Sequence, residues 1–262
     1  MTETRSVFVA GHRGMLGHVV ARLFSERGWS LRTTEQRFDG DPAGRFFAEL
    51  QAARAEVVVN CIAAPSDADA RAVLMINGLL PQMLAALGRG ALLVHASSDA
   101  VFSGLRGDYS VTEAPDAVDA YGLSKRLGER CVELGPAVVL RVSVIGPDLT
   151  RASHLLSWYL AQREAVPGYT DVHWNGITSL QWAELALRAA EGGLAPGIHQ
   201  PASGEVLSKA AVLSKIRAAY GRGVEIEPVA SGAPLNRSLR PSCEVPPLER
   251  QLEMLRDWYE SP

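Results

Sequence analysis

Tyr121 and Lys125 are the two residues whose types and spacing most directly suggest chemistry. They lie four residues apart in the segment YGLSK, at the start of a helical stretch that we expect to run to Leu134. Side chains four residues apart share one face of a helix. A phenol has a pKa of about 10, and a neighbouring ammonium group lowers that pKa by favouring the phenolate. The pair therefore predicts a tyrosine that can donate and accept a proton.

A second reactive group follows an apolar strand expected at Ala91–Ala96. This strand leads into Ser97, Ser98 and Asp99, and functional groups gather at the carboxyl ends of parallel strands in sheets of this kind. A serine hydroxyl at that edge can hydrogen-bond a substrate carbonyl and orient it toward the tyrosine. The serine thus precedes the tyrosine and the lysine in the chain, and together these groups could act on a substrate carbonyl.

A glycine loop precedes these groups in the chain. Gly11, Gly14 and Gly17 follow a buried strand expected at Val7–Ala10, and they open a helix with apolar residues at 16, 19, 20, 23 and 24. Glycines permit a sharp turn, the approach of a pyrophosphate to the backbone and close helix–sheet packing, while the helix N-terminus faces the phosphates. The spacing is G-x-x-G-x-x-G rather than G-x-G-x-x-G. Its place between a strand and an amphipathic helix nevertheless predicts a dinucleotide site.

The end of the second strand, expected at Trp29–Leu31, bears on which nicotinamide cofactor fits. An acidic residue there would hold the adenosine ribose 2′-hydroxyl, whereas this strand continues into Arg32-Thr33-Thr34, with Arg13 nearby in the glycine loop. Guanidinium groups make planar bidentate contacts with phosphate oxygens. We therefore predict NADP(H) in preference to NAD(H). In the alternative, Arg13 alone makes the contact and Arg32 is solvated. In either case Asp39 or Asp41 would lie near the adenine, and the sequence does not fix which.

The elements that must position these groups form an α/β pattern. Short β-branched runs alternate with helical stretches over the first ~145 residues, with further strands expected at Val57–Ile62 and Ala137–Val142 and a helix interrupted or begun near Pro81. Right-handed crossovers between such strands give a Rossmann doubly wound parallel sheet.

The pattern loosens beyond Gly146-Pro147. We expect helices at about 152–164, 180–191 and 208–219, strands at 197–200 and 224–229, and then a proline-rich end. The chain is accordingly predicted to hold an NADP-binding Rossmann domain at residues 1–147, to which some segments of 165–205 return. A small C-terminal lobe at 148–262 would mainly bind the substrate.

The composition argues against several other classes of protein. The 262 residues are 47% hydrophobic and 21% charged with a net charge of −3, an ordinary globular balance without the basic block that nucleic-acid binding would need. We see no apolar run near the roughly 20 residues of a membrane helix and no signal-peptide pattern. Cys61, Cys131 and Cys243 lack C-x-x-C spacing, so we expect reduced thiols, no metal site and a cytoplasmic protein.

Taken together, these segments resemble the extended short-chain dehydrogenase/reductases, and most of all the dTDP-4-dehydrorhamnose reductase branch. The matching pieces are FVAGHRGMLG, VVVNCIAA, HASSDAVFSG, EAPDAVDAYGLSKRLGER and RVSVIGP, over about residues 7–147, with weaker matches through HWNGITSLQWAELALRA. The glycine loop also resembles that of GDP-fucose synthase. One departure is S-S-D-A-V-F where the branch usually has S-T-D-Y-V-F. Serine can replace threonine chemically, and the missing ring at Ala100 would alter the fit of the substrate.

The resemblance implies a role for each matching residue. Ser98 would hold the substrate carbonyl, Tyr121 would be the acid, and Lys125 would contact the ribose and activate the tyrosine. Ala63 and Ala64 would line the cofactor groove, with Asn77 at the helix asparagine position of the family. The full set of predicted cofactor-binding residues is Gly11, His12, Arg13, Gly14, Met15, Leu16, Arg32, Asp41, Cys61, Ile62, Ala63, Ala64, Asn77, Ala96, Ser97, Tyr121, Lys125 and Val142.

The predicted reaction is the NADPH-dependent reduction of a nucleotide-linked 4-keto sugar in carbohydrate biosynthesis, with the hydride supplied by the cofactor. The predicted substrate-binding residues are Asp99, Val101, Arg151, His154, Trp174, Asn175 and Arg237, with Trp158, Thr178 and Arg240 as further candidates. Arginines would contact the diphosphate and a tryptophan would stack on a base or sugar.

Two alternative functions stay open on the same scaffold. An epimerase would use the nicotinamide transiently and return the hydride. A reductase-like regulatory subunit would not catalyse the reaction. Dehydration is disfavoured because dehydratases of this superfamily carry an Asp-Glu pair beside the serine or threonine, and here Ala100 follows Asp99. A homodimer is compatible with the sequence.

Overall fold

The computed structural model describes residues 5–149 and 154–260. Its helices are α1 (Gly17–Glu26), α2 (Arg45–Ala53), α3 (Ala70–Val73), α4 (Leu80–Leu87), α5 (Ala120–Glu129), α6 (Leu155–Ala161), α7 (Ser179–Ala190), α8 (Lys209–Tyr220) and α9 (Leu248–Glu260), with a π-helix η1 (Leu74–Leu79) and 3-10 helices η2 (Asp99–Val101) and η3 (Arg130–Glu133). Its strands are β1 (Ser6–Ala10), β2 (Ser30–Thr33), β3 (Val57–Asn60), β4 (Leu92–Ala96), β5 (Ala137–Leu140), β6 (Val144–Ile145), β7 (Val166–Tyr169), β8 (Val172–Trp174), β9 (Ile177–Thr178), β10 (Gly197–His199), β11 (Leu207–Ser208), β12 (Ile226–Val229) and β13 (Leu235–Asn236).

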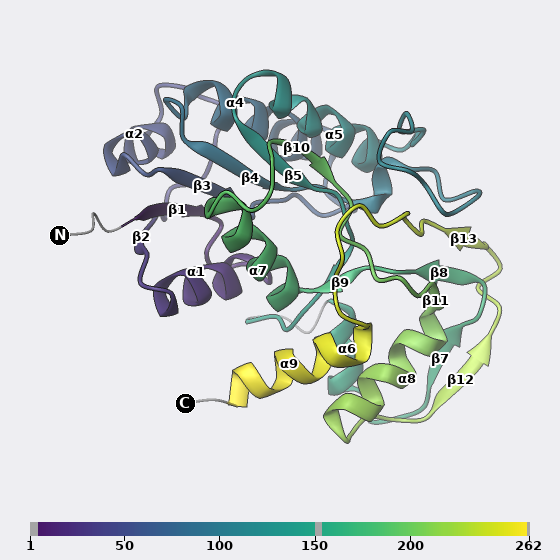
Figure 1. Ribbon diagram of the computed structural model, residues 1–262. Coiled ribbons are helices and arrows are strands. Elements are labelled where there is room, and N and C mark those ends of the chain that lie inside the picture. Colours follow the sequence, from purple (N-terminus) through teal and green to yellow (C-terminus); the bar gives the residue numbers. More distant parts are fainter. Residues whose placement is uncertain (1–4, 150–153, 261–262) are drawn as a thin grey trace.

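A six-stranded parallel sheet forms the centre of the molecule, in the order β10-β5-β4-β3-β1-β2. Helices α2, α4 and α5 cover one face of this sheet, and α1 and α7 cover the other (Figure 1). The central strands β3 and β5 are buried along their whole length, because a parallel sheet with helices on both faces has no solvent-facing side. The doubly wound fold predicted from the sequence is confirmed.

The strand order reverses between β1 and β3. From β1 the chain moves outward to β2, crosses back to β3, and then continues through β4 and β5 in the opposite direction. Ligands of doubly wound sheets bind at this reversal, outside the carboxyl ends of the strands. The glycine loop after β1 and the segment that begins at Cys61 after β3 therefore lie at the expected position for a cofactor.

The second part of the chain both completes the sheet and builds onto it. β10 pairs in parallel with β5, so that Ile198 lies opposite Val139, and α7 packs on the same face as α1. Three small sheets, β11-β8-β13, β12-β7 and β6-β9, lie with α6, α8 and α9 beyond the carboxyl edge of the main sheet (Figure 1). The return of a segment near residue 198 matches the sequence pattern; the division at residue 147 stays a prediction.

Several element boundaries differ from the sequence pattern for local reasons. β3 ends at Asn60 rather than at Ile62, because the Asn60 side chain accepts a hydrogen bond from the Ile62 amide (3.1 Å) and turns the backbone. The helix that begins at Ala120 changes to 3-10 geometry after Glu129, ahead of Gly135 and Pro136. β2 covers Ser30–Thr33, two residues later than expected at its C-terminal end.

The helical run Ala70–Leu87, formed by α3, η1 and α4, is long and apolar enough by length and composition to cross a membrane, with a mean hydropathy of 1.4. The sequence pattern did not indicate such a run. Within the fold, Leu80 and Leu84 are buried in the core cluster between α4 and the sheet. Core helices meet the same criteria, so the run is weak evidence for a membrane span.

Candidate active site

The β1–α1 turn can be built only with glycine at two positions. Gly11 has a φ of +85°, and a Cβ there would lie 2.9–3.1 Å from Ile62 and Cys61. At Gly17 a Cβ would lie only 2.0 Å from the Gly11 carbonyl oxygen. The glycines thus let the turn pass directly over the end of β3 and let α1 start beside the loop, which is the form of a phosphate cradle.

A groove of about 620 Å³ opens beside this turn. Seven predicted cofactor residues line it, namely Gly11, His12, Arg13, Gly14, Ile62, Ala63 and Ala64. Six further lining residues were missed: Thr34, Glu35, Gln36, Arg37, Phe38 and Ile76. Five of these follow β2 directly, and they were missed because the strand ends two residues later than its pattern indicated.

Glu35 corrects the argument that this rim carries no carboxylate. Its Oε1 lies 2.7 Å from Nη2 of Arg13 and 3.3 Å from Nε2 of His12. Arg32 is exposed on β2 and lies outside the lining of the groove. Of the two arginines predicted to bind a 2′-phosphate, only Arg13 lines the groove, and its guanidinium is paired with Glu35; Arg37 is a second arginine in the lining.

The other predicted cofactor residues lie around the groove or beneath it. Leu16 and Val142 are buried core residues, and Cys61 is half-buried in the segment after β3. Met15 packs near Gly146. Asp41 accepts a hydrogen bond from the Ala43 amide within its own loop.

Ser98 stands where β4 has ended and η2 begins. Its hydroxyl donates to Oδ1 of Asp99 (3.1 Å) and accepts from the Ala100 amide (3.1 Å). Burial raises the pKa of Asp99, while the nearby Arg237, the Ser98 hydroxyl and Lys209 act in the opposite direction. Ser98 is thus held at the carboxyl edge of the sheet by the two residues that follow it.

Tyr121 and Lys125 lie together in the first turns of α5. Asp119 caps this helix by accepting from the Gly122 amide (2.8 Å). The Lys125 ammonium nitrogen lies 5.9 Å from the centre of the Tyr121 ring and donates to the Ala96 carbonyl (3.1 Å). Tyr121, Lys125 and Ser98 therefore lie near one another where β4 ends.

The electrostatics of this pair differ from the simple expectation. Burial, and then the nearby Asp99 carboxylate, raise the pKa of Tyr121 instead of lowering it; the Ser98 hydroxyl and Arg237 oppose that shift. Lys125 is only 3% exposed, and burial lowers its pKa to about 8, while Glu129 acts in the opposite direction. These influences together favour the neutral, protonated form of the Tyr121 phenol.

Asn77 on the π-helix η1 connects the segment after β3 to helix α5. Its side chain accepts from the Ala64 amide (2.9 Å) and donates to the Ala64 carbonyl (3.0 Å) and to the Ser124 hydroxyl (3.3 Å). Ser124 in turn donates to the Tyr121 carbonyl (2.7 Å). Asn77 thus connects the wall of the groove to the helix that carries Tyr121.

Among the predicted substrate residues, Arg237 is brought to the site together with Asp99. Its Nε donates to the Phe102 carbonyl (3.0 Å), and its Nη2 lies 3.9 Å from Asp119 at the start of α5. Lys209, the first residue of α8, is near enough to Asp99 for their charges to interact. Lys209 was not predicted as a site residue, because the local pattern indicates the helix at 208–219 but not where that helix lies relative to the sheet.

Other predicted substrate residues have structural roles, which corrects those assignments. Val101 and Trp174 are buried in hydrophobic clusters. Asn175 is buried and uses both ends of its amide to hold the backbone of Ser203 and Leu239.

The remaining candidates lie apart from the reaction centre or outside the described residues. His154 pairs with Asp148, and Arg240 pairs with Asp108. Thr178 caps α7, and Trp158 packs against the core. Arg151 falls outside the residues that the structure describes.

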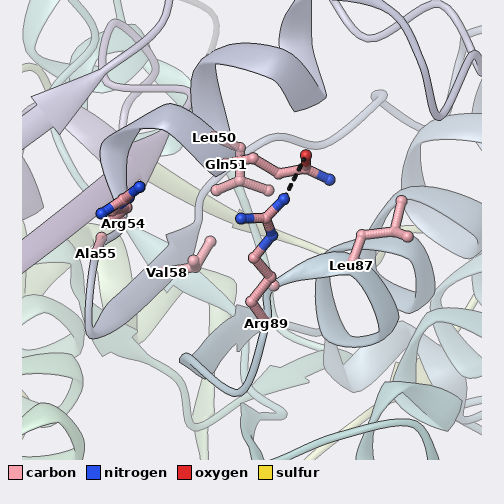
Figure 2. Close-up of a pocket in the computed structure, with 8 residues that line it drawn as sticks. Leu50, Gln51, Arg54, Ala55, Val58, Leu87 and Arg89 are labelled. Atoms are coloured by element: carbon pink, nitrogen blue, oxygen red, sulfur yellow. Dashed lines mark hydrogen bonds between the residues drawn. The ribbon is translucent and has the colours of Figure 1, made fainter.

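A second, smaller cavity lies away from this chemistry. It lies between the C-terminal ends of α2 and α4, at the amino end of β3 (Figure 2). Its volume is about 250 Å³. Arg89 lies at its rim and donates to Gln51 (3.4 Å). The cavity contains none of the predicted site residues. Over the described ranges 5–149 and 154–260, no group of three or more His, Cys, Asp or Glu side chains could hold a metal ion.

Comparison with known families places the glycine loop and the serine–tyrosine–lysine group in one domain. The family model described as "RmlD substrate binding domain" matches residues 5–154, which is more than half of the chain. The chain belongs to this family. The matched range includes the groove, Ser98, Tyr121 and Lys125 of this RmlD-family protein, and it ends before the segments that supply Lys209 and Arg237.

Relatives of this RmlD-family protein fall into two groups by name. Methionine adenosyltransferase 2 subunit beta of Xenopus tropicalis is 28% identical over 165 residues, covering 57% of this chain and 49% of the relative. dTDP-4-dehydrorhamnose reductase of Burkholderia thailandensis is 32% identical over 133 residues, covering 48% of this chain and 45% of the relative. The chain spans about half the length of the curated relatives that it matches.

Solved structures show that the fold likeness extends over nearly the whole RmlD-family chain. dTDP-4-dehydrorhamnose reductase of Bacillus anthracis, in complex with NADP, has a TM-score of 0.82 at 18% identity, covering 98% of this chain and all of that one. The C-terminal segments beyond residue 154 thus share the arrangement seen in a reductase fold.

Proposed function

We propose that this protein is an NADP(H)-dependent reductase of a nucleotide-linked 4-keto sugar, in which Ser98, Tyr121 and Lys125 carry the catalysis. The observation that carries the proposal is their meeting at the end of β4, next to the glycine-loop groove. Membership of the RmlD family and the likeness to dTDP-4-dehydrorhamnose reductases support the choice of substrate class.

The groove fits a dinucleotide by its shape and its backbone. Gly11 and Gly17 let the loop pack against the segment after β3 and against the start of α1, where side chains would clash. Because α1 begins beside the loop, its N-terminus would face a bound pyrophosphate. Residues 34–38 would hold the adenosine end. When bound, the reduced nicotinamide would supply a hydride to the keto carbon of the substrate.

The side chains of the protein would handle the carbonyl oxygen. The Ser98 hydroxyl would turn from Asp99 and donate a hydrogen bond to that oxygen, which polarises the carbonyl. As the oxygen gains negative charge, Tyr121 would transfer its phenolic proton to it and form the alcohol. The Lys125 ammonium, 5.9 Å from the ring centre, would stabilise the resulting phenolate.

The substrate diphosphate would lie toward the C-terminal segments. Arg237 and Lys209 bring two positive charges to the Asp99 side of the site, and guanidinium and ammonium groups both bind phosphate. We propose residues 1–147 as the main cofactor-binding part and 148–262 as the part that mainly binds the substrate.

NADP(H) remains the cofactor that we propose, on the strength of Arg13. This guanidinium is 74% exposed at the rim of the groove and can turn from Glu35 to a 2′-phosphate. The Bacillus anthracis reductase with NADP shows that this fold accommodates the phosphorylated cofactor.

A second candidate function is a non-catalytic subunit, because the chain is also similar to methionine adenosyltransferase 2 subunit beta. In that case the groove could still bind a dinucleotide, but no 4-keto sugar would be turned over.

NADPH oxidation with dTDP-, GDP- and UDP-linked 4-keto sugars separates these functions. We expect turnover with at least one of them and a loss of about 10²–10⁴-fold in kcat for Tyr121→Phe, because the proton donor is removed. Cofactor binding, measured by fluorescence, should persist in the variant. Binding of NADPH without turnover of any substrate would favour the subunit, and a chain that binds no nicotinamide cofactor would contradict the reductase.

A further inference from the structure

Beneath the catalytic residues lies a buried ion pair that their chemistry does not use directly. Glu129 and Arg141 have side chains that are only 4% and 2% exposed. Arg141 donates from Nε to Oε1 of Glu129 (2.8 Å) and from Nη2 to Oε2 (2.7 Å). Burying two charges costs free energy even when they are paired. We therefore expect this pair to hold neighbouring groups in place.

Glu129 makes a third contact, to the strand end that carries Ser98. The Ser97 hydroxyl donates to Oε1 of Glu129 (2.7 Å). Ser97 directly precedes Ser98 and follows Ala96, whose carbonyl accepts from Lys125. The Glu129 carboxylate thus fixes the turn at Ser97. Ser98, which would bind the substrate carbonyl, follows this residue, and Ala96, which accepts from Lys125, precedes it.

Glu129 also lies one helical turn after Lys125 on α5, on the same face. Its negative charge favours the protonated form of Lys125, against the burial that lowers the pKa of this lysine to about 8. Among the described residues, the titratable groups that act on Lys125 or contact it are Tyr121 and Glu129 on its own helix and His95 on β4. Beyond them, Asp99 acts on Tyr121 and Arg141 pairs with Glu129.

Arg141 extends the connection to the C-terminal segments. Its Nη1 donates to Oε1 of Gln200 (3.1 Å) at the end of β10, and Nε2 of Gln200 donates to the carbonyls of Tyr109 (2.8 Å) and Arg240 (3.0 Å). Arg240 lies three residues after Arg237. The same network therefore joins the catalytic helix to the segment that brings a positive charge to the substrate side.

We propose that Glu129 is a positioning residue for the reaction: its carboxylate, held by Arg141, fixes the Ser97–Ser98 turn and keeps Lys125 charged beneath Tyr121. This inference rests on the proposed reductase function for its kinetic consequences. Its statement about Lys125 concerns the folded protein alone and can be measured without a substrate.

The first experiment follows the charge of Lys125 directly. The chain has only three lysines, Lys125, Lys209 and Lys215, so NMR titration of protein labelled with ¹³C at the lysine side chains can resolve each one. In Glu129→Gln we expect the pKa of Lys125 to fall by about one unit or more, because an opposite charge is lost nearby. Glu133→Gln is the matched control: this exposed carboxylate lies one turn further along and pairs with Arg130, and it should leave the pKa of Lys125 unchanged.

The second experiment follows kcat against pH. Lys125 acts as the ammonium, so activity should fall as pH rises through its pKa, and this alkaline limb should move to lower pH in Glu129→Gln by the shift that NMR measures. Glu129→Asp retains the charge and should keep the limb in place. If the limb moves equally in Glu133→Gln, or if the pKa of Lys125 in Glu129→Gln is unchanged, the proposal is overturned.

A third variant covers the case in which Glu129→Gln does not fold. Ser97→Ala leaves the ion pair whole and removes only its link to the strand end. We expect the midpoint of thermal unfolding to fall, because a buried hydrogen bond to a charged group is lost. Well below that midpoint, kcat should also fall about tenfold, because Ser98 loses its support. An unchanged kcat would refute the positioning of Ser98. Failure of the reductase function itself would show as no turnover in the wild type, with the NMR titration still deciding the role of Glu129.

Discussion

At the scale of single residues, Glu35 is the carboxylate that pairs with Arg13 at the rim of the groove. Its carboxylate accepts from Arg13 (2.7 Å) and lies 3.3 Å from His12, and it stands two residues after β2. A carboxylate at this place can hold a ribose hydroxyl and repels a 2′-phosphate. In the proposed reductase, the balance between NAD(H) and NADP(H) would depend on whether Arg13 turns toward the 2′-phosphate or stays with Glu35.

Replacing Glu35 by glutamine should shift this balance toward NADP(H). Glu35 and Arg13 are 57% and 74% exposed, and such surface pairs contribute about 0.2–1 kcal/mol. We therefore expect Glu35→Gln to tighten NADPH binding relative to NADH by up to about fivefold, measured by titration calorimetry. Arg13→Ala should weaken NADPH binding. Arg32→Ala serves as the control and should leave both affinities as they are; weaker NADPH binding in that variant would place the 2′-phosphate on Arg32 instead.

At the scale of elements, the β1–α1 turn fixes how closely the cofactor can approach. The Gly14 amide donates to the Gly11 carbonyl (3.0 Å), and α1 starts at Gly17 directly against that same carbonyl. Any side chain at position 17 must push the loop away from β3. The loop therefore works as a unit, in which the spacing of the glycines matters more than any single contact.

We expect Gly17→Ala to abolish tight cofactor binding. Its Cβ would lie 2.0 Å from the Gly11 oxygen, a contact that only a backbone shift can relieve, and overpacking of this kind costs about 1–3 kcal/mol. Thermal unfolding with and without NADPH measures both effects. Gly204→Ala is a matched control, because a Cβ there meets nothing within 4 Å. Normal NADPH binding by Gly17→Ala would show that the loop is not the phosphate cradle.

The sequence predicts these nucleotide-binding elements well because their signals are local. The apolar face of α1 repeats with the helical period, and the buried residues Val19, Val20 and Leu23 are those of the pattern. The strand ends that carry Ser98 and the helix that carries Tyr121 follow from the same kind of pattern. Parallel strands then place these residues at a common edge, as the topology of the sheet requires.

The segments after residue 147 were harder to predict because their roles depend on distant partners. Asn175 looks like a polar binding residue in the sequence, but its amide holds Ser203 and Leu239. Lys209 contributes to the site only because α8 starts there. Helix α9 was not predicted behind Pro246 and Pro247, although Leu252 and Leu255 are buried at helical spacing; the prolines masked its start.

At the scale of the whole molecule, α9 packs its last residues against α1, the helix that follows the glycine loop. The Arg22 guanidinium lies 4.1 Å from the centre of the Trp258 ring, and Trp258 Nε1 donates to Glu26 (3.0 Å). His18 contacts Tyr259 through one ring nitrogen and the Gly14 carbonyl through the other (2.8 Å). His18 on α1 thus bridges α9 and the glycine loop, because it contacts both Tyr259 and Gly14.

The contacts between α9 and α1 should make cofactor binding depend on α9, a helix that lies outside the groove. We expect Trp258→Ala to lower the free energy of unfolding by about 1–3 kcal/mol, less than the loss of a fully buried tryptophan, since this ring is only partly buried. NADPH at 100 times its Kd stabilises a protein by about 2.7 kcal/mol. At the same NADPH concentration the variant should gain less than the wild type, because α1 no longer has its support. Arg250→Ala, which breaks an exposed pair on the same helix, should change neither quantity. Equal stabilisation by NADPH in Trp258→Ala and in the wild type would mean that the groove is held by the sheet alone.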